Sequence, residues 1–313
     1  MDRILPNLSY HSAMNLPSHI AIIGPTASGK TSLALELAQE NSGVILSLDS
    51  LAVYREIDIA SAKPTREERG EIPHFGIDLL PPDAPFDVTQ FFRSYHEAEA
   101  FAREHQRPLI IVGGSGFYLK MLIEGVSPMP EISDAIRTHV SRQVIDLSSA
   151  HRQLELLDPV FAKKIEATDA YRIEKGLIVH YATGMTPSAY FESHPPKPIL
   201  SASLPIYEVV TERSLLRERI ALRTAKMLRD GLIDEVCRLE RRYTRAPNCM
   251  KAIGITEVLS YLDGPYDYAM MKEKIITHTA RLAKRQVTFN KSQFTKTARG
   301  SLPQLKSTLL GGR

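Results

Sequence analysis

The chain has 313 residues, of which 43% are hydrophobic and 24% charged, as is usual for a globular protein. No apolar run reaches the roughly 18–20 residues that span a bilayer, so we expect no contact with a membrane. The first residues lack the apolar core of a signal peptide, and Cys237 and Cys249 form no metal-binding or disulfide pattern. These features favour a cytoplasmic protein and argue against a structural zinc site.

The net charge of +3 is unevenly distributed. Residues 270–313 contain ten Lys or Arg and one acid, a net charge of +9 that leaves −6 for the rest of the chain. Such asymmetry suggests a polyanionic partner, although a solvated basic face explains it equally well. At this chain length we also expect a core domain with an appended or inserted one.

The N-terminal residues 1–18, with Pro6 and Pro17, are predicted to have little structure, and Met14 is an alternative start of translation. A G-x-x-x-x-G-K-[ST] motif at residues 24–31 follows an apolar β-branched run and precedes a helical run, which is the context of a phosphate-binding loop. Glycines let backbone N–H groups turn toward phosphate oxygens, and the helix directs its positive end at the same anion. The predicted phosphate or diphosphate site consists of Gly24, Pro25, Thr26, Ala27, Ser28, Gly29, Lys30 and Thr31.

A buried parallel strand is predicted at residues 43–48, and it ends in Asp49 and Ser50. Ligands of such sheets bind at the carboxyl ends of the strands, so we expect Asp49 to face the same cleft as Lys30. A turn or helix cap is the structural alternative for Asp49. Two functional roles are open from the residues alone, a ligand of Mg²⁺ or a general base.

Residues 51–85 are predicted to be irregular, and Lys63 and His74 within them could be exposed to solvent. Asp87 and Gln90 then predict the start of a helix. Its core-facing stripe consists of Phe91, Tyr95, Ala98 and Ala102. Residues 108–112 predict a third buried strand, followed by a second glycine-rich turn at 112–118 whose glycines allow backbone to approach a ligand.

Residues 126–199 have helical spacing and no clear strand, which predicts a helical insertion. A strand at 205–210 returns to the sheet, and a helix follows that ends near Gly231. It carries Arg213, Arg217, Arg219 and Arg223, with acids that also allow a salt-bridged surface helix. Further helices are predicted at 249–262 and 270–294. The sequence thus predicts an α/β fold in which helices flank a parallel sheet.

The ordered motifs resemble the tRNA dimethylallyltransferases, also called tRNA isopentenyltransferases, over roughly residues 20–290. The matching blocks are GPTASGKT at 24–31, DSLAVY at 49–54, DIASAKP at 58–64, VGGSGFY at 112–118, Asp169 with Arg172, AIGITE at 252–257 and ARLAKRQ at 280–286. The sequence departs from the family pattern at Ala52 (usually Gln), Phe75 (usually His), Ser115 (usually Thr), Thr168 (usually Asn) and Phe289 (usually Trp).

The resemblance implies a P-loop NTPase-like core at residues 14–125 and 200–313, with an inserted all-helical domain at 126–199 that contacts tRNA. The implied reaction transfers a dimethylallyl group from dimethylallyl diphosphate to N6 of adenine 37, which lies 3′ of the anticodon in tRNAs that read codons beginning with U. The products are N6-(dimethylallyl)adenosine and diphosphate. We expect a cytoplasmic monomer that binds the anticodon stem-loop, with Mg²⁺ as cofactor.

The resemblance also assigns roles to residues. Asp49 is the expected base, and Thr31 is the expected ligand of Mg²⁺. Charge on the departing diphosphate would be stabilised by Thr26, Lys30, Arg219 and Arg223. The expected tRNA contacts are Asp49, Ser50, Leu51, Ala52, Ser115, Arg137, Arg172, Arg281, Lys284 and Arg285.

Three other functions remain possible from the sequence. An adenylate isopentenyltransferase uses the same donor on a free nucleotide, which needs neither a basic tail nor a helical insertion. A P-loop small-molecule kinase usually has an arginine-bearing lid, and no segment is typical of one. A GTP-hydrolysing switch needs an N-K-x-D motif, and residues 290–293 read NKSQ.

Overall fold

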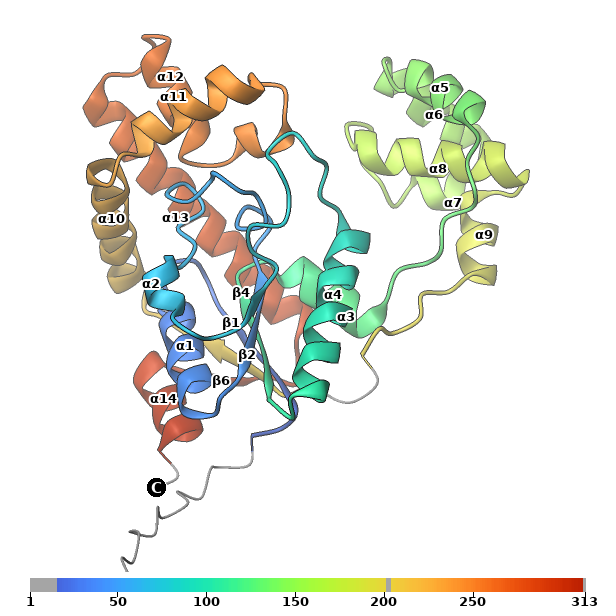
Figure 1. Ribbon diagram of the computed structural model, residues 1–313. Coiled ribbons are helices and arrows are strands. Elements are labelled where there is room, and N and C mark those ends of the chain that lie inside the picture. Colours follow the sequence, from blue (N-terminus) through green and yellow to red (C-terminus); the bar gives the residue numbers. More distant parts are fainter. Residues whose placement is uncertain (1–15, 201–203, 312–313) are drawn as a thin grey trace, which may run out of the picture. The chain divides into compact units, whose positions relative to one another are not determined.

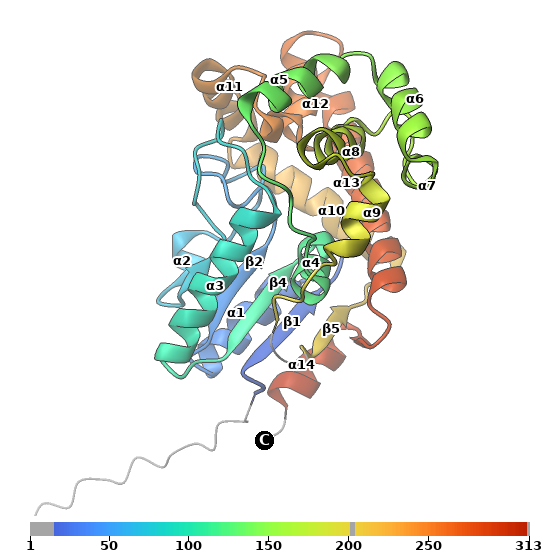
Figure 2. The ribbon, with the colours of Figure 1, turned by 90° about the vertical axis from the view of Figure 1, so that its right-hand side faces the viewer.

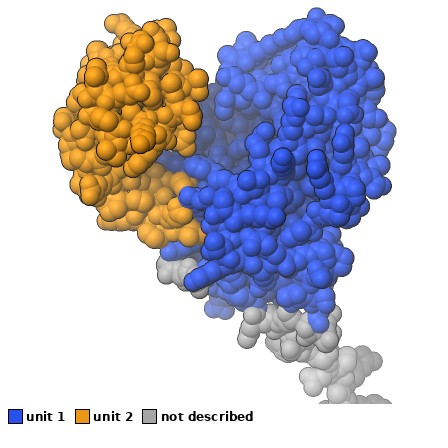
Figure 3. Space-filling view, turned by 180° about the vertical axis from the view of Figure 1, so that it is seen from behind, with its two compact units in different colours: residues 1–120, 200–313 blue, residues 121–199 orange. Residues whose placement is uncertain are grey.

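The computed structural model describes residues 16–200 and 204–311, so the alternative start at Met14 lies outside the described residues. The chain divides into two compact units, which Figure 3 shows in different colours. Unit 1 consists of Met1–Lys120 and Leu200–Arg313, and unit 2 of Met121–Ile199. The sequence-based boundary at 125/126 falls after the first junction because helix α4 (Gly116–Glu124) runs across it.

Unit 1 is built on a parallel sheet with the strand order β3-β2-β4-β1-β5-β6. The strands are β1 (His19–Ile23), β2 (Val44–Leu48), β3 (His74–Phe75), β4 (Leu109–Gly113), β5 (Ile206–Val209) and β6 (Ala298–Gly300). The central strands β1, β2 and β4 are apolar on both faces because helices cover both (Figures 1 and 2). This architecture confirms the predicted α/β fold.

Helices from distant parts of the sequence cover the sheet. On one face, α1 (Lys30–Glu40) and α14 (Leu302–Leu310) pack together over Ile20, Ile22 and Ile110. Helix α3 (Val88–Glu104) packs on β2, β3 and β4. Asp87 caps its N-terminus, as predicted. The Asp87 carboxylate accepts N–H bonds from Thr89 at 2.9 Å and Gln90 at 3.1 Å. The predicted stripe of α3 is buried throughout.

A helical layer of unit 1 packs on the segment that follows β2. Its members are α10 (Arg213–Arg229), α11 (Leu232–Tyr243), the 3₁₀-helix η1 (Asn248–Lys251), α12 (Ile255–Leu262) and α13 (Tyr268–Gln293). Side chains from α11, α12 and α13 bury Val53, Tyr54 and Ile57 in one apolar cluster. The layer therefore fixes the position of residues just beyond Asp49.

The regular elements of unit 2 are all helices, as the apolar spacing of residues 126–199 predicts. It contains α5 (Asp134–Gln143), α6 (Leu147–Leu157), α7 (Pro159–Ala162), α8 (Ala170–Thr183) and α9 (Pro187–Ser193). Its core includes Val140, Leu154, Ile173 and Leu177. In either unit, no helix of the described ranges combines the length and apolar character needed to cross a membrane.

Several elements differ from the sequence-based expectations. The irregular segment 51–85 contains β3 and the short helix α2 (Arg66–Arg69), which is closed by a capping box from Thr65 and Glu68. The predicted helix at 249–262 is interrupted at Gly254, whose φ of +96° breaks the helical path. The elements α11, β6 and α14 were not predicted from the sequence.

The basic tail is not one continuous surface. Its charges on α13 include the exposed Arg281 and Lys284, whereas the tail beyond α13 returns to the sheet as β6 and α14. There the side chain of Arg299 pairs with buried Glu208 at 2.7 Å, and Lys306 pairs with Glu36 at 2.5 Å. Part of the tail's positive charge therefore serves internal pairing.

Candidate active site at the phosphate-binding loop

The loop between β1 and α1 has a backbone that only glycine fits at two positions. Gly24 has φ +153°, and a Cβ there would lie 2.9 Å from the carbonyl oxygen of Val209. Gly29 has φ +92°, and its Cβ would lie 2.7 Å from a methyl group of Leu302 on α14. The glycine pattern thus reflects both a turning backbone and tight packing by neighbouring elements, as a phosphate-binding loop requires.

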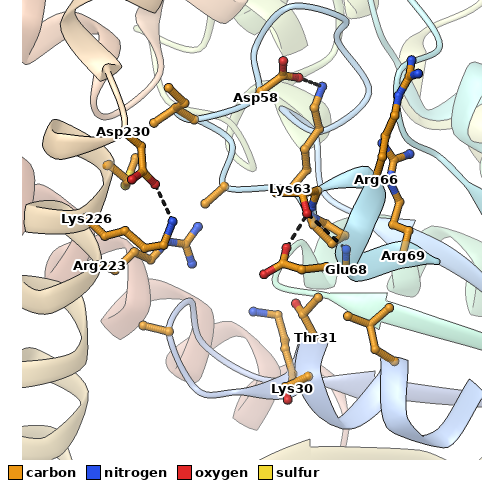
Figure 4. Close-up of a pocket in the computed structure, with 18 of the residues that line it drawn as sticks. Lys30, Thr31, Asp58, Lys63, Arg66, Glu68, Arg69, Arg223, Lys226 and Asp230 are labelled. Atoms are coloured by element: carbon orange, nitrogen blue, oxygen red, sulfur yellow. Dashed lines mark hydrogen bonds and ion pairs between the residues drawn. The ribbon is translucent and has the colours of Figure 1, made fainter. Parts of the chain in front are cut away.

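Two cavities meet at this loop, and both are lined by unit 1. The outer cavity, of about 1270 Å³, lies between α1, residues 55–69 and α10 (Figure 4). The inner cavity, of about 370 Å³, lies at the ends of β2 and β4 beside α13. The residues that line both are Lys30, Thr31, Ala62, Lys63, Pro64, Arg223 and Met227. The lysine and threonine of the loop thus stand where the cavities join.

Lys30 is positioned by the loop itself, since its ammonium group donates a hydrogen bond to the Pro25 carbonyl oxygen at 3.2 Å. The residue is half-buried overall, but its ammonium group is enclosed by protein. Burial, and then the neighbouring Arg223, lower the pKa of Lys30 to about 8, while Asp49 opposes the shift. A group so poorly solvated gains by pairing with a bound anion.

Two arginines of α10 reach the loop. They are four residues apart and so lie on one face of the helix. Arg219 donates to the Ser28 carbonyl oxygen at 3.3 Å, and Arg223 donates to the Thr26 hydroxyl at 3.2 Å. Arg217 points elsewhere and pairs with Glu273 at 3.7 Å. The alternative of a salt-bridged surface helix therefore fits Arg217 but neither Arg219 nor Arg223.

Asp49 lines the inner cavity together with Lys30, as predicted from its place at the end of β2. Its Oδ1 atom accepts N–H bonds from Leu51 at 2.8 Å and Ala52 at 3.3 Å. These bonds close a tight turn and hold the carboxylate in one orientation. Asp49 thus caps a turn and also lines the cavity. Its place in the turn does not exclude a functional role.

The second glycine-rich turn serves close packing of the protein on itself. A Cβ on Gly113 would lie 2.4 Å from the Leu48 carbonyl oxygen, and one on Gly114 would lie 2.3 Å from Nε2 of Gln286. A Cβ on Gly116 would meet the side chain of Asn290 at 2.7 Å. Protein atoms thus occupy the Cβ positions of these three glycines, while Gly113 and Gly114 also line the inner cavity. That a ligand approaches their backbone there stays a prediction.

The predicted tRNA contacts fall in three places. Besides Asp49, the inner cavity is lined by Ser50, Leu51, Ala52 and Ser115. Arg281, Lys284 and Arg285 are exposed along α13 of unit 1. Arg137 on α5 and Arg172 on α8 are exposed on unit 2, and Arg172 pairs with Asp169. The structure thus brings together the cavity group and leaves the basic groups on separate surfaces.

Some residues of the site carry no local signal in the sequence. Gln286 of α13 accepts a hydrogen bond from the backbone N–H of Thr26 at 2.9 Å, across 260 residues of sequence. The side chain of Lys63 is only 4% exposed and lies 2.7 Å from Asp58, so the alternative of a solvent-exposed lysine does not hold. His74 is half-buried and bonds to the Ile72 carbonyl oxygen at 2.7 Å.

The pKa of Lys30 predicts how anion binding depends on pH. Because this pKa is lowered to about 8, the ammonium form prevails below that pH and is lost above it. We therefore expect the affinity for inorganic diphosphate to fall by up to about tenfold per pH unit above pH 8. Calorimetric titration between about pH 7 and 9.5 measures this. Lys30→Met should bind weakly with a flatter profile, and a flat profile for the unchanged protein would contradict the assignment.

The fold and the site together define a class. A phosphate-binding loop lies at the carboxyl edge of a parallel sheet, with two arginines directed at it and a carboxylate in the adjoining cavity. This is a P-loop protein of the kind that binds a phosphate or diphosphate group next to a second substrate.

The chain belongs to the IPP transferase family, whose model matches residues 52–293; a model described as isopentenyl transferase matches residues 17–78. A tRNA dimethylallyltransferase of Sulfurovum sp. (strain NBC37-1) is 54% identical over 300 residues, covering 96% of this chain and 100% of that protein. One of Aliarcobacter butzleri is 50% identical over 291 residues, covering 93% and 97%. The chain is therefore an enzyme of the prenyl-transferring class.

Solved structures agree with this assignment. The tRNA isopentenylpyrophosphate transferase of Bacillus halodurans superposes with a TM-score of 0.67 at 28% identity, covering 94% of this chain and 95% of that one. A eukaryotic dimethylallyltransferase acting on tRNA has the same fold, with a TM-score of 0.81 at 23% identity over 94% of this chain and 76% of its own. The P-loop NTPase-like fold is thus that of its structural neighbours.

Proposed function

We propose that this enzyme transfers a dimethylallyl group from dimethylallyl diphosphate to N6 of adenine 37, beside the anticodon, in tRNAs that read codons beginning with U. The products are N6-(dimethylallyl)adenosine and diphosphate. One observation supports the proposal: Asp49, Lys30 and Arg223 line the same cavity, so a carboxylate and two cationic side chains are available to substrates bound there. Transfer from an allylic diphosphate to a weakly nucleophilic amine needs both.

The cationic side chains at the phosphate-binding loop stabilise the leaving group. The allylic carbon–oxygen bond breaks, and its electron pair departs with the diphosphate. Lys30 and Arg223 present positive charge from enclosed positions, where electrostatic stabilisation of that developing charge is strongest. Arg219 adds a second guanidinium, and the Thr26 hydroxyl, held by Arg223, can donate to the departing oxygen.

The carboxylate side accounts for the acceptor. The lone pair of N6 is delocalised into the adenine ring, so the amine must lose a proton as the new carbon–nitrogen bond forms. Asp49 accepts that proton as general base. Its Oδ1 is held by the N–H groups of Leu51 and Ala52, which leaves Oδ2 for the proton. Because the amine needs a proton acceptor, we assign Asp49 the role of base rather than that of metal ligand.

The donor set at the loop fits Mg²⁺ that arrives with the diphosphate. Among the described residues, no group of three or more His, Cys, Asp or Glu could hold a metal. Mg²⁺ takes few protein ligands and keeps water and phosphate oxygens, so the hydroxyl of Thr31, exposed where the two cavities join, suffices. When bound, the ion would neutralise charge on the diphosphate.

A tRNA presents adenine 37 in its anticodon loop, and the base must leave its stack to enter a cavity. We propose that the inner cavity receives it against Ser50, Leu51, Ala52 and Ser115. The exposed Arg281, Lys284 and Arg285 of α13, and Arg137 and Arg172 of unit 2, are the proposed contacts to phosphates of the anticodon stem-loop. Such binding weakens as salt rises. Every proposed group comes from one chain, so we propose a monomer, acting in the cytoplasm.

The substrate is tested by labelling. Purified enzyme with Mg²⁺ and radioactive dimethylallyl diphosphate is offered unmodified tRNA or AMP in parallel. We expect label on tRNA, at the nucleoside that mass spectrometry identifies as N6-(dimethylallyl)adenosine, and none on AMP. Efficient labelling of AMP with none of tRNA would establish the adenylate isopentenyltransferase instead. Consumption of ATP without use of the prenyl donor would establish a kinase.

A further inference from the structure

A buried carboxylate outside both cavities holds a loop that lines both of them. Glu235 of α11 is 2% exposed, and it accepts hydrogen bonds from three consecutive backbone N–H groups. Its Oε2 atom bonds to Asp58 at 3.0 Å and to Ile59 at 2.8 Å, and its Oε1 atom bonds to Ala60 at 2.9 Å. The carboxylate therefore holds the main chain of residues 58–60 in one conformation without lining either cavity.

The stretch that Glu235 fixes, residues 57–63, reaches the site directly. Ala60 and Ser61 line the inner cavity, and Lys63 lines both cavities; Figure 4 shows Asp58 and Lys63 of this stretch at the outer one. The Ser61 carbonyl oxygen accepts a hydrogen bond from Nη2 of Arg223 at 3.4 Å. This carbonyl and the Thr26 hydroxyl are two acceptors that orient the same guanidinium.

Packing alone does not explain a glutamate at this position. A buried carboxylate without a cation is costly, and an apolar side chain would fill the space at lower cost. Within residues 16–200 and 204–311, no ion pair involves Glu235, so the three N–H groups are its compensation. Burial raises the pKa of the carboxyl, which these N–H bonds oppose by favouring the charged form. The residue is suited to holding main chain in one conformation.

We propose that Glu235 is a positioning residue, which sets the direction of the Arg223 guanidinium by fixing the Ser61 carbonyl through residues 57–63. The inference rests on the proposed function, because it concerns how Arg223 meets the departing diphosphate. Glu235 itself touches no substrate.

The first test is Glu235→Gln. Glutamine keeps one carbonyl oxygen but turns an NH₂ group toward a backbone N–H, so it cannot keep all three hydrogen bonds. We expect kcat on tRNA to fall by about tenfold or more, with Kd for tRNA unchanged, as for loss of an aligned electrostatic donor. The matched control is Asp234→Asn, an exposed acid on the same helical turn, which should leave kcat unchanged. An unchanged kcat for Glu235→Gln would overturn the inference.

The second test separates positioning from general support of the fold. If Glu235 acts through Arg223, adding Glu235→Gln to Arg223→Ala should lower kcat no further, whereas independent effects would multiply. Multiplied losses in soluble, folded protein would overturn the inference. If Glu235→Gln does not fold, Glu235→Asp enters the same cycle, because it keeps the charge and shortens the side chain.

The outcomes are distinct from those for the function itself. Unchanged enzyme is first assayed for prenyl transfer to tRNA, and failure there refutes the proposed function. An active unchanged enzyme with an unaffected Glu235→Gln variant refutes only the role of Glu235.

Discussion

Replacing Asp49 by asparagine is expected to lower the rate of prenyl transfer by about 10²–10⁴-fold and to leave tRNA affinity nearly unchanged. Asparagine can still accept the N–H bonds of Leu51 and Ala52 through its own Oδ1, so the turn after β2 persists. Its amide cannot take up the proton of N6. Single-turnover rates with saturating enzyme, together with filter binding of tRNA, measure the two quantities separately.

Asp234→Asn is the control for the loss of one negative charge, since that residue is exposed on α11 and lines neither cavity. Near-normal turnover of Asp49→Asn would remove Asp49 as the base. A loss confined to tRNA binding would assign it to recognition instead.

Removing the guanidinium of Arg223 is expected to lower kcat by about 10²–10³-fold. The group is enclosed by protein and donates hydrogen bonds to Thr26 and Ser61, so its charge acts on the departing diphosphate with little screening by solvent. Arg223→Ala should also weaken inhibition by the product diphosphate, because the same group holds the product. Steady-state kinetics with varied donor and added diphosphate measure both effects.

The control for Arg223 lies two turns along the same helix. Arg229 is exposed near the end of α10 and lines neither cavity, so Arg229→Ala should keep both kcat and product inhibition. Equal losses in the two variants would show a general effect of charge on tRNA binding rather than a local effect at the diphosphate.

The sequence predicted the parts of the fold that have strong local signals. β1, β2 and β4 are mostly apolar runs of five residues, and the loop at Gly24 is a motif with a known physical mechanism. By contrast, β6 is three residues long and reads Ala-Arg-Gly, with no β-branched or large apolar residue to mark a strand. It becomes one only because β5 offers it an edge.

For the site, too, the sequence predicted the features that have local signals but not the long-range contacts. The place of Asp49 followed from strand ends, and the two arginines share a face because they are four residues apart. The links that hold the site together depend on tertiary contacts over long separations. Gln286 meets Thr26 across 260 residues, and Glu235 meets Ala60 across 175. No local pattern encodes such pairs. The sequence also could not tell that Gly113 and Gly114 accommodate neighbouring protein atoms.

The phosphate-binding loop is supported by elements from the C-terminal part of the chain, which has a consequence for biosynthesis. Leu302 of α14 packs against Gly29, and β5, the neighbour of β1, begins only at Ile206. Because synthesis proceeds from the N-terminus, the ribosome releases the loop before the elements that pack against it, and the edge of β1 that pairs with β5 stays unpaired until β5 is made. A nascent chain halted before Ala298 would contain every catalytic side chain proposed above. It would still lack β6 and α14, and with them the Leu302 side chain that packs against Gly29.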